Sequence, residues 1–496
     1  MTPDLAIVAS SIAVALCLSG AAADGAERQQ PFFSIRRLMV CPTGRIAQGN
    51  EWCKRMGMPE WTTKWSDTLW ENWSDERIRK YARQIGEYGF NSVELCEIRG
   101  YRGIWTDDDL KSKITPKLRT FMKAARDNGL QVSQFIWGQS LFEEGRNFCW
   151  NSPDERLKME AEYRRLARTY GDLVDHIVIH VGDPGGCDRN GCDAYKTTQE
   201  IAAFLLNEYR KMNPKITCTL STWANFGFWN GREGVEFLDE SYCPKEIGIA
   251  LHRWYDADKA KLVRAAGREC DIWGWYLSDF EMELDSALLM RRLDAYFTSL
   301  PAQASKEIRA ISTEICFHGW PHIINAYVSA QKMIDPKRPL QEIEREFCAG
   351  TFGEANAEAM LKVYQAAEEY VHPERYYGFI PASDCLPVVF GTPDYNKRLR
   401  DALAAGHTVK FDPKRPPRFT ASTDPADLHR FLMDNLRLIS IFSEAQERIG
   451  TGKANGATTE ELAAIISRAE AEAAPLAHYP DFGPLVNQVR KSAKAK

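Results

Sequence analysis

Several short motifs of common enzyme classes are absent from this chain of 496 residues. It contains no GxGxxG, no P-loop, no GxSxG and no HExxH, so the dinucleotide, nucleotide, serine-hydrolase and zinc-protease sites that these motifs build are excluded. Basic runs are also absent apart from the Lys-rich C-terminal end, and the formal net charge is −5 with a pI of about 6.1. We therefore expect no nucleic acid among its partners.

For the N-terminal segment the alternatives are a transmembrane anchor and a signal peptide, and the second is favoured. The N-terminal segment Leu5–Ala23 is apolar, but it is short and rich in Ala and Ser for a membrane span. It ends in three alanines, which is typical of a signal-peptide cleavage site. We predict that residues 1–23 are a signal peptide, that the mature chain is secreted or periplasmic, and that it makes no stable membrane insertion after cleavage.

Patterns of metal ligands are sparse. Cys187 and Cys192 lie close enough in sequence to close a loop or bind a metal, but two cysteines alone are too few for a zinc site. No HxH pair occurs, and the spacing of His176 and His180 separates them by about 13 Å along a strand. We therefore predict no metal and no cofactor. Thirteen cysteines, one of them in the signal segment, leave an even number that permits disulfides in an exported chain.

The sequence does contain a regular alternation of two patterns. Short apolar runs bounded by Gly and Pro predict strands, and amphipathic segments between them predict helices. Because the strands number eight over about 300 residues, the pattern favours a (β/α)8 TIM barrel, an α/β fold, over residues 31–335 rather than an open sheet. The predicted strands are 32–40, 90–98, 130–137, 176–181, 216–222, 247–251, 272–277 and 308–315.

Beyond Pro336 the pattern changes. No Trp occurs after Trp320, and the strand pattern stops. We predict a C-terminal all-helical domain over residues 336–496, with a loop-rich part between Pro381 and Pro425. Its expected helices are 340–347, 355–370, 426–449 and 459–472.

The expected strands have two different faces. In the sixth, Ile247, Ile249 and Leu251 alternate with Gly248, Ala250 and His252. One face is therefore apolar and suited to pack on helices, and the other turns polar toward its C-terminal end.

Acidic residues follow or end several of these strands. The apolar run of the fourth strand stops at Gly182-Asp183-Pro184, three residues after His180, and Asp279 and Glu281 follow the seventh strand. Glu97 follows the second strand, and Glu314 lies in the eighth. Two carboxyl groups facing each other across a barrel mouth are what glycosidic cleavage needs, one as acid and one as base or nucleophile. The alternative is that each acid caps a turn or pairs with arginine.

Aromatic and histidine side chains gather at the same strand ends. Sugar rings stack on aromatic rings, and a concave site needs apolar walls with a few polar groups. The alternative for each tryptophan is a place in the core. A long segment between Pro42 and Trp73 contains five tryptophans and is expected to line one side of the same site. The candidate substrate-binding residues are Trp137, His180, Trp223, His252, Trp254, His318 and Trp320.

Three of these stretches resemble a known family. Gly182-Asp-Pro-Gly-Gly186, Thr313-Glu-Ile-Cys-Phe-His-Gly-Trp320 and Glu346-Phe-Cys-Ala-Gly-Thr-Phe-Gly353 are similar to the α-glucuronidase group, glycoside hydrolase families 67 and 115, and more distantly to the family 20 hexosaminidases. In family 67 the acid is a Glu just before a Pro-Gly turn, and Asp183 holds that place here. The Asp-Glu pair of family 20 at the end of strand four is absent, which argues against an acetamido-assisted mechanism.

The sequence therefore predicts a secreted exo-acting glycoside hydrolase, α-glucuronidase-like by its resemblance, that acts on a poly- or oligosaccharide. Asp183 is the expected general acid and Glu281 the base or nucleophile, while Asp279 and Glu314 bind hydroxyls or adjust the pKa of the other two. Two alternatives stay open: a hexosaminidase-like glycosidase, and a non-catalytic barrel protein that binds carbohydrate. The expected partner is the carbohydrate substrate, and the sequence does not indicate an oligomeric state.

Overall fold

The computed structural model describes most of the chain. The described residues are 30–40, 70–96, 108–138, 148–180, 187, 189–221, 240–241, 243–252, 255–274, 288, 290–315, 323–369, 390–412, 414, 417–477 and 482–494. Residues 1–29 are outside this set, so the predicted signal peptide lies outside the described residues, and the boundary at 335/336 stays a prediction.

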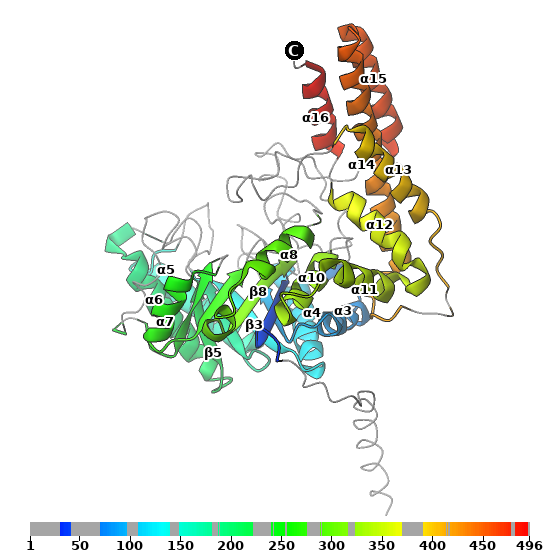
Figure 1. Cartoon of the computed structure of the whole chain (residues 1–496). Helices are drawn as coiled ribbons and strands as arrows, with labels where there is room; N and C mark the ends of the chain where they lie inside the picture. Colours follow the sequence, from blue (N-terminus) through cyan, green and yellow to red (C-terminus); the bar gives the residue numbers. More distant parts are fainter. Residues whose placement is uncertain are drawn as a thin grey trace, which may run out of the picture. The chain divides into compact units, whose positions relative to one another are not determined.

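The predicted barrel is confirmed. Eight parallel strands pair in chain order, and the last pairs with the first, so the sheet closes on itself (Figure 1). The closing register places Ile35 beside Ala310 and Val40 beside Ile315. The strands are β1 (Ile35–Val40), β2 (Ser92–Cys96), β3 (Gln131–Trp137), β4 (His176–His180), β5 (Thr217–Ser221), β6 (Ile247–His252), β7 (Cys270–Gly274) and β8 (Ala310–Ile315).

Helices lie between the strands, and their first turns carry the expected signals. Ser74 caps the first of them by accepting a hydrogen bond from the Arg77 amide at 3.2 Å. One helix, which begins at Asp108, contains Pro116 in its interior, although proline is more typical of a first turn. The helices are α3 (Asp75–Glu87), α4 (Asp108–Asp127), α5 (Pro153–Tyr170), α6 (Ala194–Arg210), α7 (Ala257–Ala265), α8 (Met290–Ser299), α9 (Ala304–Glu307) and α10 (Ile323–Ile334), with short 3-10 turns η3 (Trp70–Asn72) and η5 (Arg189–Gly191).

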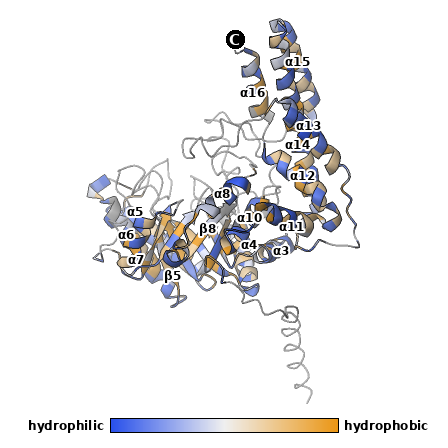
Figure 2. Cartoon of the chain, viewed as in Figure 1, coloured by the Kyte–Doolittle hydropathy of each residue, from blue (hydrophilic) through white to orange (hydrophobic). Residues whose placement is uncertain are grey.

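The two faces of the strands separate as their alternation predicts. Residues on the outer face, such as Leu38, Ile177 and Ile311, belong to the large core that the strands share with the helices. Phe135 and Trp273 are also buried, but they lie outside that core, on the face that lines the barrel interior. Hydrophobic residues are concentrated on the strands, as Figure 2 shows, so burial of the outer face is the main support of the barrel.

Two tryptophans of the predicted aromatic segment belong to the core, which corrects their expected role. Trp70 and Trp73 have 0% and 2% of their surface exposed. Their rings stack at 5.9 Å, both contact Tyr81 of α3, and Trp70 also contacts Phe121 of α4. These two residues therefore support the helix layer instead of walling a sugar site. The other three tryptophans of the segment lie outside the described residues.

After the barrel the described chain is helical, as predicted, but one helix was missed. Residues 393–406 form α13 inside the stretch expected to be loop-rich, which is a correction. Thr392 accepts a hydrogen bond from the Tyr395 amide, and Tyr395 and Leu399 bury one face. The helices are α11 (Leu340–Phe352), α12 (Ala357–Glu368), α13 (Pro393–Gly406), α14 (Pro425–Ala454), α15 (Thr459–Ala473) and α16 (Phe482–Lys494), with η7 (Glu354–Asn356) and η10 (Ala474–Leu476). No helix among the described residues is both long and apolar enough to cross a membrane.

The segment before α14 packs on helices of the barrel. The ring of Phe419 lies 5.4 Å from Tyr88 and 5.3 Å from Tyr327, and Glu87 accepts hydrogen bonds from the amide and hydroxyl of Thr420. A side-chain carbon at Gly350 would overlap the Phe419 ring, so this close approach requires glycine. The C-terminal helices are thus joined to the barrel by aromatic packing.

A buried carboxyl group in α12 makes stability depend on pH. Glu368 is 2% exposed, and burial raises its pKa to about 8, while Arg291 contributes a backbone N–H at 2.6 Å. In the unfolded chain the same group ionises near pH 4.3. Between these two pH values the native state holds a proton that the unfolded state has lost. The contribution of Glu368 to the free energy of unfolding is therefore complete below about pH 4.3. It decreases by about 1.4 kcal/mol per pH unit as the pH rises to about 8.

We therefore expect Glu368→Gln to flatten the pH dependence of the free energy of unfolding. Urea unfolding at several pH values between about 5 and 8 measures this slope for both proteins. Glu358→Gln, an exposed position on the same helix, is the matched control and should keep the wild-type slope. An unchanged slope in Glu368→Gln would show that this carboxyl group is ionised in the native state.

Candidate active site at the barrel mouth

The mouth of the barrel is formed by the carboxyl ends of eight parallel strands, where such folds hold their chemistry. Among the described residues, His180 ends β4 and His252 ends β6. Trp273 lies in β7 and Phe135 in β3. We call Phe135, His180, His252 and Trp273 the aromatic floor.

Trp273 holds the aromatic floor together. Its ring stacks on Phe135 at 5.1 Å with an angle of 8°, and β3 and β7 are four strands apart in the closed order. The contact therefore crosses the barrel axis. The rings of His180 and His252 lie 5.0 Å and 5.5 Å from the same tryptophan. These side chains fill the interior beneath the strand ends, so the barrel is a packed core with a closed base and not a pore.

The two histidines of the floor differ in exposure. His180 is fully buried, and its Nδ1 lies 3.3 Å from the hydroxyl of Ser221. His252 is half-buried. Both were predicted to bind substrate, and this role stays a prediction. The contacts of His180 position it within the floor. His252 is partly exposed as a residue, but its Nε2 atom is buried.

A buried charge network, Arg37, Glu94, His176, Asp271 and Arg309, lies against the floor. Glu94 accepts a hydrogen bond from Trp273 Nε1 at 3.2 Å and pairs with Arg37 at 3.2 Å. Asp271 accepts two hydrogen bonds from Arg309, at 2.9 and 2.7 Å, and lies 3.9 Å from Arg37. The network links β1, β2 and β7 through the barrel interior.

The charges of the network balance. Burial lowers the pKa of His176 well below its ordinary value, and the two nearby guanidinium groups lower it further, so the ring is neutral. Its nitrogens lie 2.8 Å from Thr217 Oγ1 and 3.1 Å from Thr219 Oγ1. Burial raises the pKa of Glu94, and Arg37 opposes this shift. Two guanidinium groups thus face two carboxyl groups, which fits a positioning role beneath the mouth.

Sequence reasoning missed this network, although a signal exists. Arg37, Glu94 and Asp271 stand inside short apolar strands, and their spacing from the core-facing residues puts them on the inner face. A charged residue at such a position must find a partner inside the barrel. The partners themselves come from distant strands, so their pairing cannot be read from the chain.

The predicted catalytic residues are mostly outside the described residues. This holds for Asp183, Asp279 and Glu281. Glu314 lies in β8, where its backbone is paired with Met39, and Trp137 lies in β3, paired with His180; their side chains are not described. Trp223, Trp254, His318 and Trp320 also lie outside. The structure therefore describes the ends of β4, β7 and β8, and the site assignments that follow them stay predictions.

One described hollow lies elsewhere. A surface groove of about 430 Å³ lies between α13 and α14. Its lining includes Arg400 and Glu444, which pair with each other at 3.1 Å. The groove has no stacked aromatic wall, so the strand-end rim is the better candidate for carbohydrate chemistry. The lining residues are Arg400, Glu444, Glu447, Arg448, Thr451, Gly452 and Asn455.

Comparison with known proteins gives matches among solved structures only. No protein-family model and no curated protein matches the chain. A glycoside hydrolase family 138 enzyme targeting pectin rhamnogalacturonan II aligns with 92% of this chain and 63% of its own, at 10% identity and a TM-score of 0.49. A family 20 exo-β-N-acetylglucosaminidase from Vibrio harveyi aligns with 68% of this chain and 59% of its own, at 12% identity and a TM-score of 0.43.

A third match is the chitobiase of Flavobacterium johnsoniae, which aligns with 92% of this chain and 78% of its own, at 10% identity and a TM-score of 0.37. The chain spans less than two thirds of the length of the family 138 enzyme. At these TM-scores and identities the matches carry no argument about activity, and the fold rests on the strand pairing itself. The resemblance to families 67 and 115 is not among these matches and stays a resemblance of short sequence stretches.

Proposed function

We propose that the chain is an exported, exo-acting glycoside hydrolase whose site is the mouth of the barrel. The observation that supports this most is the closed (β/α)8 barrel, whose interior is filled by the aromatic floor near the carboxyl ends of the strands. In the sequence, carboxylates follow β4 and β7 within a few residues and Glu314 lies in β8. Turn capping alone does not explain why acidic residues recur at several strand ends of one rim, whereas a catalytic site does.

The proposed mechanism uses two carboxyl groups. Asp183 protonates the oxygen of the leaving group, and Glu281 attacks the anomeric carbon or activates water. Asp279 and Glu314 bind hydroxyl groups or adjust the pKa of the reacting pair. A rigid base beneath the mouth supports such chemistry, since catalytic groups need fixed positions relative to the substrate.

The proposed substrate is a poly- or oligosaccharide cleaved from one end. Tryptophans at the strand ends would stack on sugar rings, and histidines would bind hydroxyls or a sugar carboxylate. The sequence stretches shared with the α-glucuronidase group favour a uronic acid as the terminal sugar. The missing Asp-Glu pair after β4 makes a hexosaminidase-like reaction the weaker candidate.

Turnover of aryl glycosides tests the proposal. We expect the purified protein to release the aryl group from at least one member of a panel that includes glucuronides, N-acetylhexosaminides and neutral glycosides. Calorimetric titration with the corresponding free sugars provides the comparison. Binding of a sugar without turnover of any member would contradict the proposed reaction and identify a carbohydrate-binding protein.

Export is tested separately. If residues 1–23 are a signal peptide, mass spectrometry of protein secreted from a bacterial host should find a mature N-terminus near Asp24. A variant with Leu16→Arg, which interrupts the apolar run, should stay in the cytoplasm with its N-terminus intact. Soluble secreted protein that retains Met1 would contradict export by this segment.

A further inference from the structure

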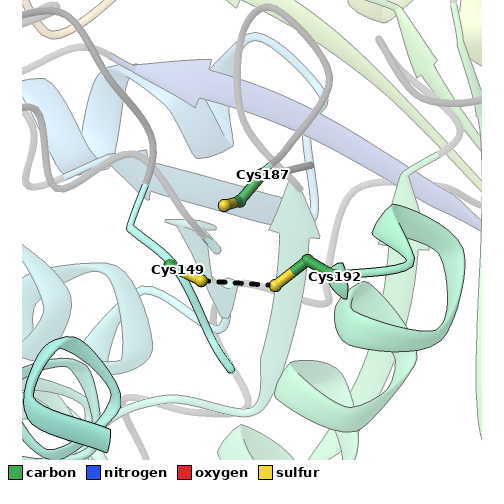
Figure 3. Close-up of side chains that lie close together, drawn as sticks. All are labelled: Cys149, Cys187 and Cys192. Atoms are coloured by element: carbon green, nitrogen blue, oxygen red, sulfur yellow. Dashed lines mark hydrogen bonds between the residues drawn. The ribbon is translucent and has the colours of Figure 1, made fainter. Parts of the chain in front are cut away.

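Three cysteines from the two connections that follow β3 and β4 meet, as Figure 3 shows. Cys149 precedes α5, Cys187 follows β4, and Cys192 precedes α6. Their sulfur atoms all lie within 4.8 Å of one another, and those of Cys149 and Cys192 are 3.5 Å apart. The sequence analysis considered Cys187 and Cys192 only. The third cysteine, distant in sequence, removes the objection that two are too few for a metal.

The backbone between two of the cysteines makes a tight turn. Asn190 has a φ of 54° and Gly191 a φ of 69°, and both values are in the left-handed region that Asn and Gly adopt most readily. The Cys192 amide donates to the Arg189 carbonyl at 3.0 Å. This turn brings Cys187 and Cys192, which have four residues between them, to one point.

A carboxylate joins the turn to the third cysteine. Glu155 accepts two hydrogen bonds from the Arg189 guanidinium, at 3.0 and 2.9 Å, and a third from the Cys149 amide at 2.7 Å. These bonds involve no sulfur atom. The three cysteines are thus held together by a scaffold that does not depend on any bond between them.

N–H groups lie beside two of the three sulfur atoms, and Cys149 Sγ also lies 3.5 Å from the carbonyl oxygen of Arg189. The Arg189 amide donates to Cys187 Sγ at 3.3 Å, and the Asn190 side-chain amide donates to Cys149 Sγ at 3.5 Å. N–H groups aimed at sulfur stabilise thiolates, the form in which cysteine binds metals.

We propose that Cys149, Cys187 and Cys192 bind one thiophilic divalent cation of the Zn²⁺ class. A tetrahedral ion with Zn–S bonds of about 2.3 Å holds its sulfur ligands about 3.8 Å apart. Here Cys149 Sγ and Cys192 Sγ are 3.5 Å apart, and all three sulfur atoms lie within 4.8 Å of one another. Four residues between two ligands is also within the usual spacing. Binding replaces the remaining thiol protons, which pass to solvent. Cys192 is half-buried, so water can take the fourth position.

The site would join two connections of the barrel mouth. Cys149 lies between β3 and α5, and Cys187 lies between β4 and α6. Asp183, the acid of the proposed function, stands in the sequence between β4 and Cys187. The cation would therefore hold the connection that carries this acid; this consequence rests on the proposed function, whereas the metal site does not.

Metal content tests the site. We expect the full-length protein, purified without chelators, to contain one zinc per chain by plasma mass spectrometry. Added Co²⁺ should give a thiolate-to-cobalt charge-transfer band. Each of Cys149→Ser, Cys187→Ser and Cys192→Ser should lose the bound metal and the band. Cys348→Ser, a buried cysteine of α11, is the matched control and should retain both.

Two results would overturn the proposal. One is metal-free wild-type protein whose non-reduced peptide map shows two of the three cysteines linked as a disulfide. The other is unchanged metal content in all three serine variants. Circular dichroism of each variant confirms that it is folded, so lost metal cannot be attributed to unfolding. Since metal content is measured without substrate, failure of the glycosidase proposal leaves this result intact.

Discussion

Replacement of Asp183 by Asn is expected to lower kcat by about 10²–10⁴-fold, the usual contribution of general acid catalysis. Asn keeps the shape of the side chain but has no proton to donate to the leaving oxygen. The loss should therefore depend on the leaving group. A glycoside with a poor leaving group should show the full effect, while a dinitrophenyl glycoside, whose leaving group needs no protonation, should lose far less.

The contrast between the two substrates separates catalysis from turn capping. If Asp183 only caps the turn before Pro184, its loss shifts the loop and weakens both substrates alike. Asp193→Asn provides a matched control, because Asp193 accepts a hydrogen bond from the Lys196 amide at the start of α6. Its kinetics should stay near wild type. Equal losses for both substrates in Asp183→Asn, or no loss, would assign the acid role to another residue, with Glu314 the next to test.

Replacement of Arg37 by Met is expected to lower the free energy of unfolding by about 3–5 kcal/mol, the usual cost of removing one partner from a buried ion pair. Arg37 is 2% exposed and reaches both Glu94 and Asp271. Without it, Glu94 keeps the hydrogen bond from Trp273 but loses the cation that opposes the effect of burial on its pKa, so a buried carboxyl group is left without its ionic partner. Urea unfolding followed by circular dichroism measures the change.

Two further variants locate the cause of that loss. Arg345→Met removes an arginine from an exposed pair with Glu354 and Glu358, and such pairs contribute about 0–1 kcal/mol. The double variant Arg37→Met/Glu94→Gln also removes the carboxyl group that has lost its ionic partner, and it should recover part of the free energy of unfolding. If Arg37→Met lowered the free energy of unfolding no more than Arg345→Met does, the buried network would not contribute to stability as its burial implies.

The barrel could be predicted from the sequence because its signals are local. Alternation along 247–252 separates core-facing from inward residues without knowledge of the neighbouring strands. The count of eight strands then favoured closure. In contrast, α13 was missed, since prolines nearby suggested loops, while the capping by Thr392 and the buried face of the helix depend on packing against its neighbours.

The interior of the barrel could not be predicted in the same way. Trp273 and Phe135 come into contact because β3 and β7 face each other across the axis, which only the closed register determines. The same holds for the meeting of Arg37 with Asp271 and of Cys149 with Cys192. Residues at strand ends were accessible to sequence reasoning; contacts between distant strands were not, since they depend on tertiary geometry.

The most direct test of the account is a crystal structure of the Asp183→Asn variant with a bound monosaccharide. We expect the sugar at the carboxyl ends of the strands, with residue 183 and Glu281 on opposite sides of it. Their carboxyl positions should lie about 5–5.5 Å apart in a retaining enzyme or about 6.5–9.5 Å apart in an inverting one. A sugar bound in the groove between α13 and α14, or a strand-end site in which these two residues do not flank the sugar, would contradict the account.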